Sequence, residues 1–414
     1  MSGRSISGAK LKAEGKNLLP FAFYLSPFLL PLINQSYIVM KKLLLILSLI
    51  SPLFCSAQKK GALPKTYDLV IGAYTRPNGN KGIAVYRFYA ETGKLAYLSQ
   101  IDSILNPTYV CVSPDRKFVY SGGENKPGVV SAFKFDYTTG KLVLLNKQPA
   151  GASVVHVAID KKQKNVFAAA YSGGNLTVLP INKDGSLAPP IQTVQHEGTG
   201  TNKSRQEAPH THSSILSPDE KYLMTADLGT DKINIYKYSA SKNPPLTPAD
   251  PEFEMVKGGN GPRHMTFSED GKYMYLVQEM GSAVNAYAYN KGKLTFLQSL
   301  NLNPDGYTGR ASGADVHISP DGAYLYASNR GINEIVQYAI NPDNGQLTFI
   351  SRISTDRTPR SFLIAPAGNF LIVSCQDGNS VTVFKVDKAT GKLTPTANKI
   401  DIPTPVCIQL VSAE

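Results

Sequence analysis

The 414-residue chain contains no tryptophan, four cysteines and six histidines. Three of the cysteines, Cys111, Cys375 and Cys407, lie in apolar, strand-like stretches, and the fourth lies within the N-terminal 57 residues. An odd number of cysteines in such stretches is typical of buried free thiols. The composition therefore argues against a fold held together by a disulfide framework.

The chain also lacks the sequence patterns of several functional classes. It has no run of lysine and arginine and no alternation of basic and aromatic residues, which argues against a nucleic-acid partner. A glycine-rich phosphate loop, a serine nucleophile elbow and a paired Cys–His nucleophile are absent as well. The net charge of +12 falls to +7 when residues 1–57, with six basic residues and one acidic residue, are removed. A scattered excess of this size is typical of a solvated surface.

No uninterrupted apolar run is long enough to span a bilayer. Residues 40–57 begin with two lysines after the methionine, continue through a short apolar stretch and end in small residues, which is typical of a secretory signal peptide cut after Ala57. Residues 1–39 are interpreted as an upstream extension outside the fold, and the alternative is a proline-kinked membrane anchor over residues 18–33. The mature protein, residues 58–414, is therefore predicted to be exported, to the periplasm, without inserting into a membrane.

A repeat of about 50 residues organises the rest of the chain. A Gly-x-Leu turn recurs, and between these turns a second turn, usually Ser-Pro-Asp, precedes alternating apolar and polar residues, as in Ser319–Arg330. Such alternation is typical of a strand with one buried face. The aspartates of the second turn are interpreted as turn residues. The Gly-x-Leu turns start at Gly93, Gly140, Gly185, Gly292, Gly345 and Gly391.

Each copy supplies four short strands and no amphipathic helix. This pattern predicts an all-β fold, a seven-bladed β-propeller of four-stranded antiparallel blades. The seventh copy is split, because residues 404–411 match a first strand and residues from Asp68 onward match the other three. Pairing of the C-terminal strand into the N-terminal blade would close the ring and leave no free sheet edge. The six complete copies start near Thr108, Val154, His212, Arg263, Ala314 and Arg360.

Two alignment columns are predicted to meet at one mouth of the central channel. The first strand of a blade lines the channel and the second returns beside it, so the start of one and the end of the other lie on the same face. Unlike polar residues occupy these columns, whereas a purely structural repeat would keep one residue type. The first column reads Thr108, His212, Arg263, Ala314, Arg360 and Val406, and the second reads Glu124, Leu228, Glu279, Arg330, Gln376 and Tyr74.

The histidines divide between this mouth and the rest of the fold. His156 is interpreted as a core residue, and His196 as part of a solvated or lid segment, Gln195–Glu207. The pair His210 and His212 could form half of a zinc site, but no second ligand cluster accompanies it, so no metal is expected. The histidines predicted to lie near the mouth are His210, His212, His264 and His317.

Four motifs in order resemble the lactonase family of seven-bladed β-propellers, which includes bacterial 6-phosphogluconolactonase and fungal carboxymuconate cyclase. They lie in residues 209–236, 261–287, 311–331 and 358–384, and contain Pro-His-Thr-His, Gly-Pro-Arg-His, Ser-Asn-Arg-Gly and Thr-Pro-Arg-Ser. The resemblance covers residues 66–412. It implies a site at the channel mouth that needs neither metal nor cofactor.

Site residues follow from the resemblance and from the two columns. The resemblance implies four catalytic residues: His212, Arg263, Glu279 and Arg330. The columns and their neighbours add candidate substrate-binding residues: His210, His264, Arg360, Gln376, Tyr74 and Glu124.

The resemblance implies hydrolysis of a sugar lactone. This reaction needs a base of near-neutral pKa and positive groups that hold the oxyanion. His212 is the expected base and Arg263 and Arg330 the expected oxyanion contacts, with Glu279 as a positioning group or, with the roles exchanged, as the base. The alternatives are a muconate-type lactonising cyclase and a non-catalytic periplasmic propeller that binds a protein, a glycan or an anion.

Overall fold

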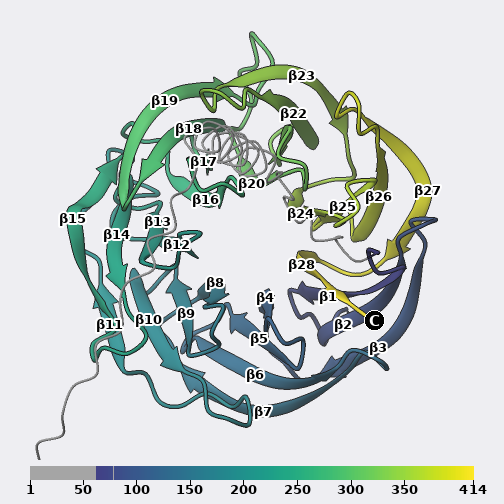
Figure 1. Cartoon of the computed structure of the whole chain (residues 1–414), viewed down its shortest axis with the longest axis horizontal. Coiled ribbons are helices and arrows are strands. Elements are labelled where there is room, and N and C mark those ends of the chain that lie inside the picture. The colour runs from purple at the N-terminus through teal and green to yellow at the C-terminus, as the bar shows by residue number, and fades with distance from the viewer. Residues whose placement is uncertain (1–61, 78) are drawn as a thin grey trace, which may run out of the picture. The chain divides into compact units, whose positions relative to one another are not determined.

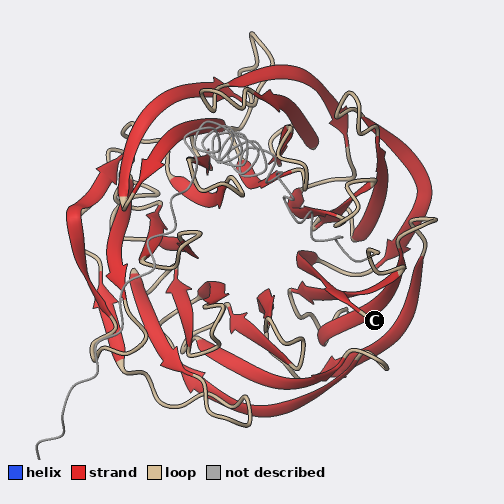
Figure 2. Cartoon of the chain, in the orientation of Figure 1, coloured by secondary structure: helices blue, strands red, loops and turns tan. Residues whose placement is uncertain are grey.

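The computed structural model describes residues 62–77 and 79–414, and all regular secondary structure in this part is β-strand (Figure 2). Residues Leu63–Glu414 form one compact unit. Its strands make seven four-stranded antiparallel sheets around a central axis (Figure 1). The predicted all-β, seven-bladed propeller is therefore confirmed. The predicted signal peptide, residues 40–57, and the upstream extension, residues 1–39, lie outside the described residues.

Every blade runs from a strand beside the axis to a strand at the rim. The innermost strands are β4 (Pro107–Val112), β8 (Val154–Ile159), β12 (Thr211–Leu216), β16 (Pro262–Phe267), β20 (Gly313–Ile318), β24 (Pro359–Ile364) and β28 (Pro405–Ser412). The second strands are β5 (Phe118–Gly123), β9 (Asn165–Ala170), β13 (Tyr222–Asp227), β17 (Tyr273–Gln278), β21 (Tyr324–Asn329), β25 (Phe370–Cys375) and β1 (Thr66–Ala73).

The third and fourth strands complete the blades in the same order. The third strands are β6 (Val129–Asp136), β10 (Asn175–Pro180), β14 (Lys232–Tyr238), β18 (Ala283–Asn290), β22 (Glu334–Ile340), β26 (Ser380–Val386) and β2 (Gly82–Tyr89). The outermost strands are β7 (Lys141–Pro149), β11 (Gln192–Gln195), β15 (Leu246–Met255), β19 (Lys293–Asn301), β23 (Leu347–Ser354), β27 (Leu393–Asp401) and β3 (Leu95–Asp102).

The two ends of the propeller meet in one blade, as predicted. β28 pairs antiparallel with β1, from Tyr67 opposite Ser412 to Ala73 opposite Pro405. Every innermost strand also contacts the innermost strands of both neighbouring blades. The ring is thus closed by backbone hydrogen bonds between the first and last strands of the unit, and no edge is left open at the seam.

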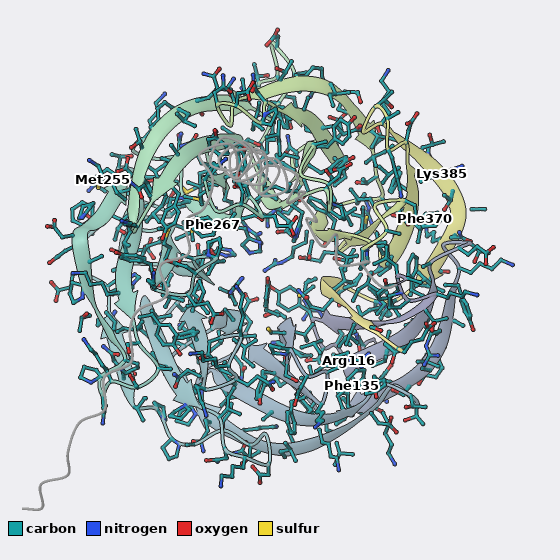
Figure 3. The ribbon with its side chains drawn as sticks, in the orientation of Figure 1. Arg116, Phe135, Met255, Phe267, Phe370 and Lys385 are labelled. Carbon is teal, nitrogen blue, oxygen red and sulfur yellow. The ribbon has the colours of Figure 1, made fainter. Side chains whose placement is uncertain are left out.

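The hydrophobic core lies between neighbouring blades. Both faces of a sheet pack against another sheet, so a second strand such as β9 is buried along its whole length. Phe88 packs edge to face against Phe370 of the adjacent blade, with ring centroids 6.0 Å apart. Side chains fill the spaces between the sheets, whereas Met255 lies on an outermost strand and is exposed (Figure 3). Cys111, Cys375 and Cys407 are free thiols, as predicted, although Cys111 is only partly buried.

The two repeated turn signals have separate structural roles. In the Ser-Pro-Asp turn, Ser113 Oγ donates to Asp115 Oδ1 at 2.7 Å and accepts from the Phe118 N–H at 2.9 Å, which confirms the aspartate as a turn residue. In the Gly-x-Leu turn, Gly185 has a φ of 83°, a conformation that favours glycine. Its carbonyl accepts from Tyr120 Oη of the preceding blade at 3.0 Å. Tyr275 and Tyr326 donate in the same way to the carbonyls of Gly345 and Gly391, so the turn joins neighbouring blades at three places.

Candidate active site

A bulge near the start of each innermost strand turns the first alignment column toward the channel mouth. The pairing register of the first two strands shifts at His212, Arg263 and Arg360, so each of these residues is the additional residue of a bulge. A bulge changes the direction of a side chain and leaves its residue out of the ladder. The second column follows directly after the second strands, with Glu279 after β17 and Arg330 after β21. The predicted meeting of the two columns is confirmed.

Glu279 is the centre of the site. Its Oε2 accepts from Arg263 Nε at 3.1 Å and lies 3.0 Å from Arg330 Nη2. Its Oε1 accepts from Arg205 Nη2 at 2.7 Å. Arg263 also donates to the Ala314 carbonyl and Arg330 to the Gly313 carbonyl, so both guanidinium groups are fixed from two sides.

Burial and mutual charge set the protonation of this cluster. Burial alone would raise the pKa of Glu279, but the charges of Arg330 and Arg263 outweigh it and hold that pKa well below its usual range. Burial and the neighbouring Arg330 lower the pKa of Arg263 to about 9. Glu279 is therefore a carboxylate at neutral pH, and a weak base.

His212 lies beside this carboxylate. Its Nε2 is 3.8 Å from Glu279 Oε2, and its ring meets the rings of Tyr171 and His264 edge to face. Burial, followed by the charge of Arg263, lowers the pKa of His212 well below its usual range, so the imidazole is neutral at neutral pH. Its Nδ1 is buried and has no hydrogen-bond partner among the described residues.

A second polar group lines the mouth across from Glu279. Tyr74 Oη donates to Glu124 Oε2 at 2.6 Å, and Arg360 Nη2 lies 3.7 Å from the same oxygen. Arg360 Nη1 donates to Gln376 Oε1 at 3.1 Å. Burial raises the pKa of Tyr74 to about 12, so its hydroxyl stays protonated and available as a donor. These four predicted binding residues contact one another directly.

His210 lies at the rim of the mouth. Its ring stacks on Tyr171 at 4.5 Å between centroids, and its Nε2 is 3.3 Å from Glu207 Oε1. Tyr171 was not among the predicted site residues, although it directly follows β9 and so occupies the second alignment column. Extending that column to the blade that begins at Val154 would have identified it.

The segment Gln195–Glu207 differs from the prediction in part. His196 was expected to be solvated, but it is buried, and its Nδ1 lies 2.6 Å from Asp227 Oδ2. Tyr236 Oη lies 3.0 Å from its Nε2. This buried attachment fixes a segment that carries Arg205 to Glu279. Arg205 was missed because it lies outside the repeat, where no alignment column marks it.

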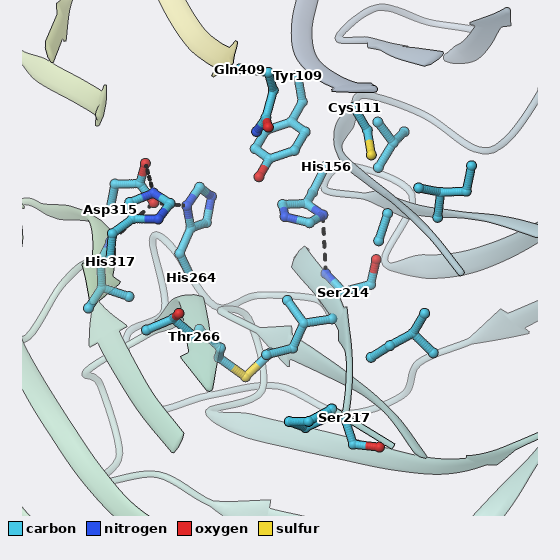
Figure 4. Close-up of a pocket in the computed structure, with 18 of the residues that line it drawn as sticks. Tyr109, Cys111, His156, Ser214, Ser217, His264, Thr266, Asp315, His317 and Gln409 are labelled. Atoms are coloured by element: carbon cyan, nitrogen blue, oxygen red, sulfur yellow. Dashed lines mark hydrogen bonds and ion pairs between the residues drawn. The ribbon is translucent and has the colours of Figure 1, made fainter. Parts of the chain in front are cut away.

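The structure corrects the predicted place of His317. The innermost strands enter at the arginine-lined mouth, and residues further along them line a cavity of about 390 Å³ toward the other end of the channel (Figure 4). His264 Nδ1 lies 2.8 Å from Asp315 Oδ1, and His317 Nε2 lies 3.2 Å from Asp315 Oδ2. His264 thus lies between the mouth and this cavity, whereas His317 faces the cavity. His156 is buried against Tyr109 in the same group.

Within residues 62–77 and 79–414, no three His, Cys, Asp or Glu side chains are grouped so as to hold a metal ion. The same residues contain no helix with the length and hydrophobicity of a membrane span. The groups that the mouth offers to a ligand are guanidinium, imidazole, carboxylate, phenol and amide.

The fold and the mouth define a class of seven-bladed β-propeller whose polar residues gather at one opening of the channel. Residues 68–410 match the family described as lactonase, seven-bladed β-propeller. The chain belongs to this family, and it is a 6-phosphogluconolactonase-like lactonase.

Relatives cover nearly the whole propeller. The 6-phosphogluconolactonase of Formosa agariphila is 37% identical over 335 residues, which are 78% of this chain and 94% of the relative. That of Bacillus subtilis is 33% identical over 346 residues, 82% and 97% of the two chains. Among solved structures, the periplasmic gluconolactonase of Pseudomonas aeruginosa is similar with a TM-score of 0.80 at 33% identity, covering 84% of this chain and 100% of that one.

Proposed function

We propose that the protein hydrolyses the lactone of a sugar acid that carries an anionic group. The charge balance of the mouth is the observation that supports an anionic substrate. Four arginines contact two carboxylates, and the adjacent imidazole of His212 is neutral, so these six charged side chains carry an excess of two positive charges, with the exposed Glu207 at the rim outside the group. The charged groups are Arg205, Arg263, Arg330, Arg360, Glu124 and Glu279.

In the proposed reaction, His212 is the base. A water molecule attacks the lactone carbonyl carbon while His212 Nε2 takes one of its protons, and Arg263 and Arg330 stabilise the oxyanion. The ring C–O bond then breaks, the imidazolium returns its proton to the departing ring oxygen, and the open hydroxy acid forms. Glu279 is held as a carboxylate by its arginines. Burial also lowers the pKa of His212, and the carboxylate 3.8 Å away opposes this by stabilising the imidazolium.

Export of the mature protein is part of the proposal. It is supported by the signal-peptide pattern of residues 40–57. The similar Pseudomonas aeruginosa protein is named as periplasmic, which agrees with it. An exported enzyme would act on lactones that reach the periplasm, so an unphosphorylated or carboxylate-bearing sugar lactone belongs in the substrate panel beside the 6-phosphate.

Proton release at constant pH tests the activity. Glucono-δ-lactone and its 6-phosphate should both be compared with a buffer blank, because these lactones also open spontaneously. His212→Gln is expected to lower the enzymatic rate by about a hundredfold or more, the scale of a lost acid–base group. His317→Gln, which changes a histidine at the far cavity, is the matched control and should keep the wild-type rate. Equal rates in His212→Gln and wild type would remove His212 as the base.

The same experiment separates the enzyme from the other readings. No turnover of any lactone, combined with calorimetric binding of gluconate, would instead support a ligand-binding propeller. Loss of absorbance on addition of a carboxymuconate would support the cyclase.

A further inference from the structure

One cation of the mouth comes from outside the blades. The segment that connects β11 to β12 is held by two buried side chains, His196 and Gln206. Gln206 Oε1 accepts from the Asn202 N–H at 2.9 Å, and its Nε2 donates to the Leu228 carbonyl at 2.8 Å. Because Leu228 follows β13, the segment is fastened to the blade of β12–β15, which carries His212. Its course is therefore fixed by the propeller, and Arg205 beside Gln206 is placed by it.

Arg205 is the most accessible of the four arginines. Its side chain is 38% exposed, against 2% for Arg263 and 11% for Arg330. Within the described residues both of its side-chain hydrogen bonds leave from Nη2, to Glu279 Oε1 at 2.7 Å and to Tyr171 Oη at 3.2 Å. Nε and Nη1 therefore keep donors for a ligand at a partly exposed position. Arg263 and Arg330 each bind both a carboxylate and a backbone carbonyl, and the free Nε of Arg330 is buried.

We propose that Arg205 is the specificity-determining contact for the anionic substituent of the substrate, a phosphate or a carboxylate remote from the lactone carbonyl. The proposal rests on the lactone hydrolysis proposed above. The Nε and Nη1 hydrogens each offer a hydrogen bond to an oxygen of either group, and the charge of the guanidinium makes these bonds stronger than those it would make to a hydroxyl. The difference in exposure between the arginines also assigns their roles. Arg263 and Arg330 are buried around Glu279 and face the reacting carbonyl, while Arg205 meets whatever extends toward solvent.

The test measures the turnover of three lactones by the wild-type protein, by one variant and by a control variant. Glucono-δ-lactone is neutral, its 6-phosphate carries a phosphate, and a glucaric acid lactone carries a carboxylate. Arg205→Ala is expected to lower kcat/KM for the charged lactones relative to the neutral one by about tenfold or more, mainly through KM. Lys203→Ala removes a neighbouring exposed cation of the same segment, and it should leave that ratio unchanged. The charged lactone with the larger loss identifies the substituent.

An equal loss on all three lactones would overturn the proposal, because Arg205 would then act through Glu279 alone. In that case the pH profile of kcat for the neutral lactone should also shift. If Arg205 only contacts the anionic substituent, that pH profile should not change. Wild-type kcat/KM for all three lactones in Arg205→Ala would likewise overturn the proposal.

Calorimetry separates the failure of this proposal from the failure of the proposed function. The product 6-phosphogluconate should bind wild type at least about tenfold more tightly than Arg205→Ala, while gluconate should show a smaller difference. If wild type turned over no lactone but kept this difference, the reaction would be wrong and the anion contact would stand. If both proteins bound 6-phosphogluconate equally, the anion contact would be wrong whatever the rates.

Discussion

At the scale of single residues, one carboxylate organises the mouth. Glu279 is shared by Arg205, Arg263 and Arg330; the carboxylate, Arg263 and Arg330 are largely buried, whereas Arg205 is partly exposed. Bringing several charges out of water is costly, so the arrangement is stable only while each arginine has a partner. The low pKa of Glu279 is a consequence of the same contacts.

Glu279→Gln should therefore affect activity and stability together. The amide keeps one acceptor oxygen and adds two N–H donors that face guanidinium groups. We expect a loss of kcat of about a hundredfold or more, because the arginines lose their alignment and His212 loses its stabilising charge. We also expect a decrease of about 3 kcal/mol in the free energy of unfolding, measured by urea denaturation.

A matched variant makes the Glu279 prediction specific. Glu334→Gln removes a carboxylate that lies 3.4 Å from Arg352, on the third and fourth strands of a blade and away from the mouth. Its effect should be below about 1 kcal/mol, with no loss of activity. A Glu279→Gln protein with wild-type kcat would show that the cluster is only structural.

At the scale of elements, a strand end, a turn and a connecting segment are joined by one buried aspartate. Asp227 Oδ1 accepts from the backbone N–H groups of His210, Gly229 and Thr230 at 2.9 to 3.1 Å. Its Oδ2 holds His196 at 2.6 Å. The start of β12, the turn after β13 and the segment that carries Arg205 are thus positioned by the same side chain.

Asp227→Ala is expected to lower the free energy of unfolding by about 3 kcal/mol, because it leaves three buried N–H groups and an imidazole without their acceptor. It should also raise KM in the same direction as Arg205→Ala. Asp227→Asn keeps one acceptor oxygen and should lose less. Asp219→Ala, at an exposed turn, is the control. Thermal unfolding together with lactone kinetics would check this, and an Asp227→Ala protein as stable as Asp219→Ala would contradict it.

At the scale of the whole molecule, three neighbouring blades place neutral imidazoles in the channel. Burial is the first cause that lowers the pKa of His156, His212 and His264, and the pKa of His264 falls to about 4. In the unfolded chain the same groups titrate near 6.5. Between these values the unfolded state binds more protons than the folded state, so acid favours unfolding.

The free energy of unfolding should therefore be greatest above about pH 6.5 and should fall as the pH is lowered toward 4, by up to about 1.4 kcal/mol per pH unit for each such histidine. Urea midpoints at pH 7.5, 6.0 and 5.0 would measure the slope. His156→Phe preserves an aromatic ring against Tyr109 but cannot take up a proton. The free energy of unfolding of this variant should therefore depend less steeply on pH, by the contribution of about one proton. A free energy that does not change over this range would contradict the expectation.

Much of the fold and part of the site could be predicted because they follow the repeat. Alternating residues and turn signals are local, and they give the blades, the split seventh blade and the two columns that contain Glu279, Arg330 and Arg360. Other site residues carry no repeated signal. Arg205 and His196 lie in a connection peculiar to one blade, and Asp315 is marked only by its contacts with two histidines.

The sequence by itself determined how many blades form, where the ring closes and which column each polar side chain occupies, because short-range periodicity fixes strands and turns. Only the tertiary structure decided which of these side chains meet. The bulges that turn His212, Arg263 and Arg360 into the mouth depend on pairing between strands, and the attachment of Arg205 depends on a buried histidine that seemed, from its polar neighbours, to face water. Contacts of this kind join residues far apart in the chain, and their strength comes from burial that no local pattern records.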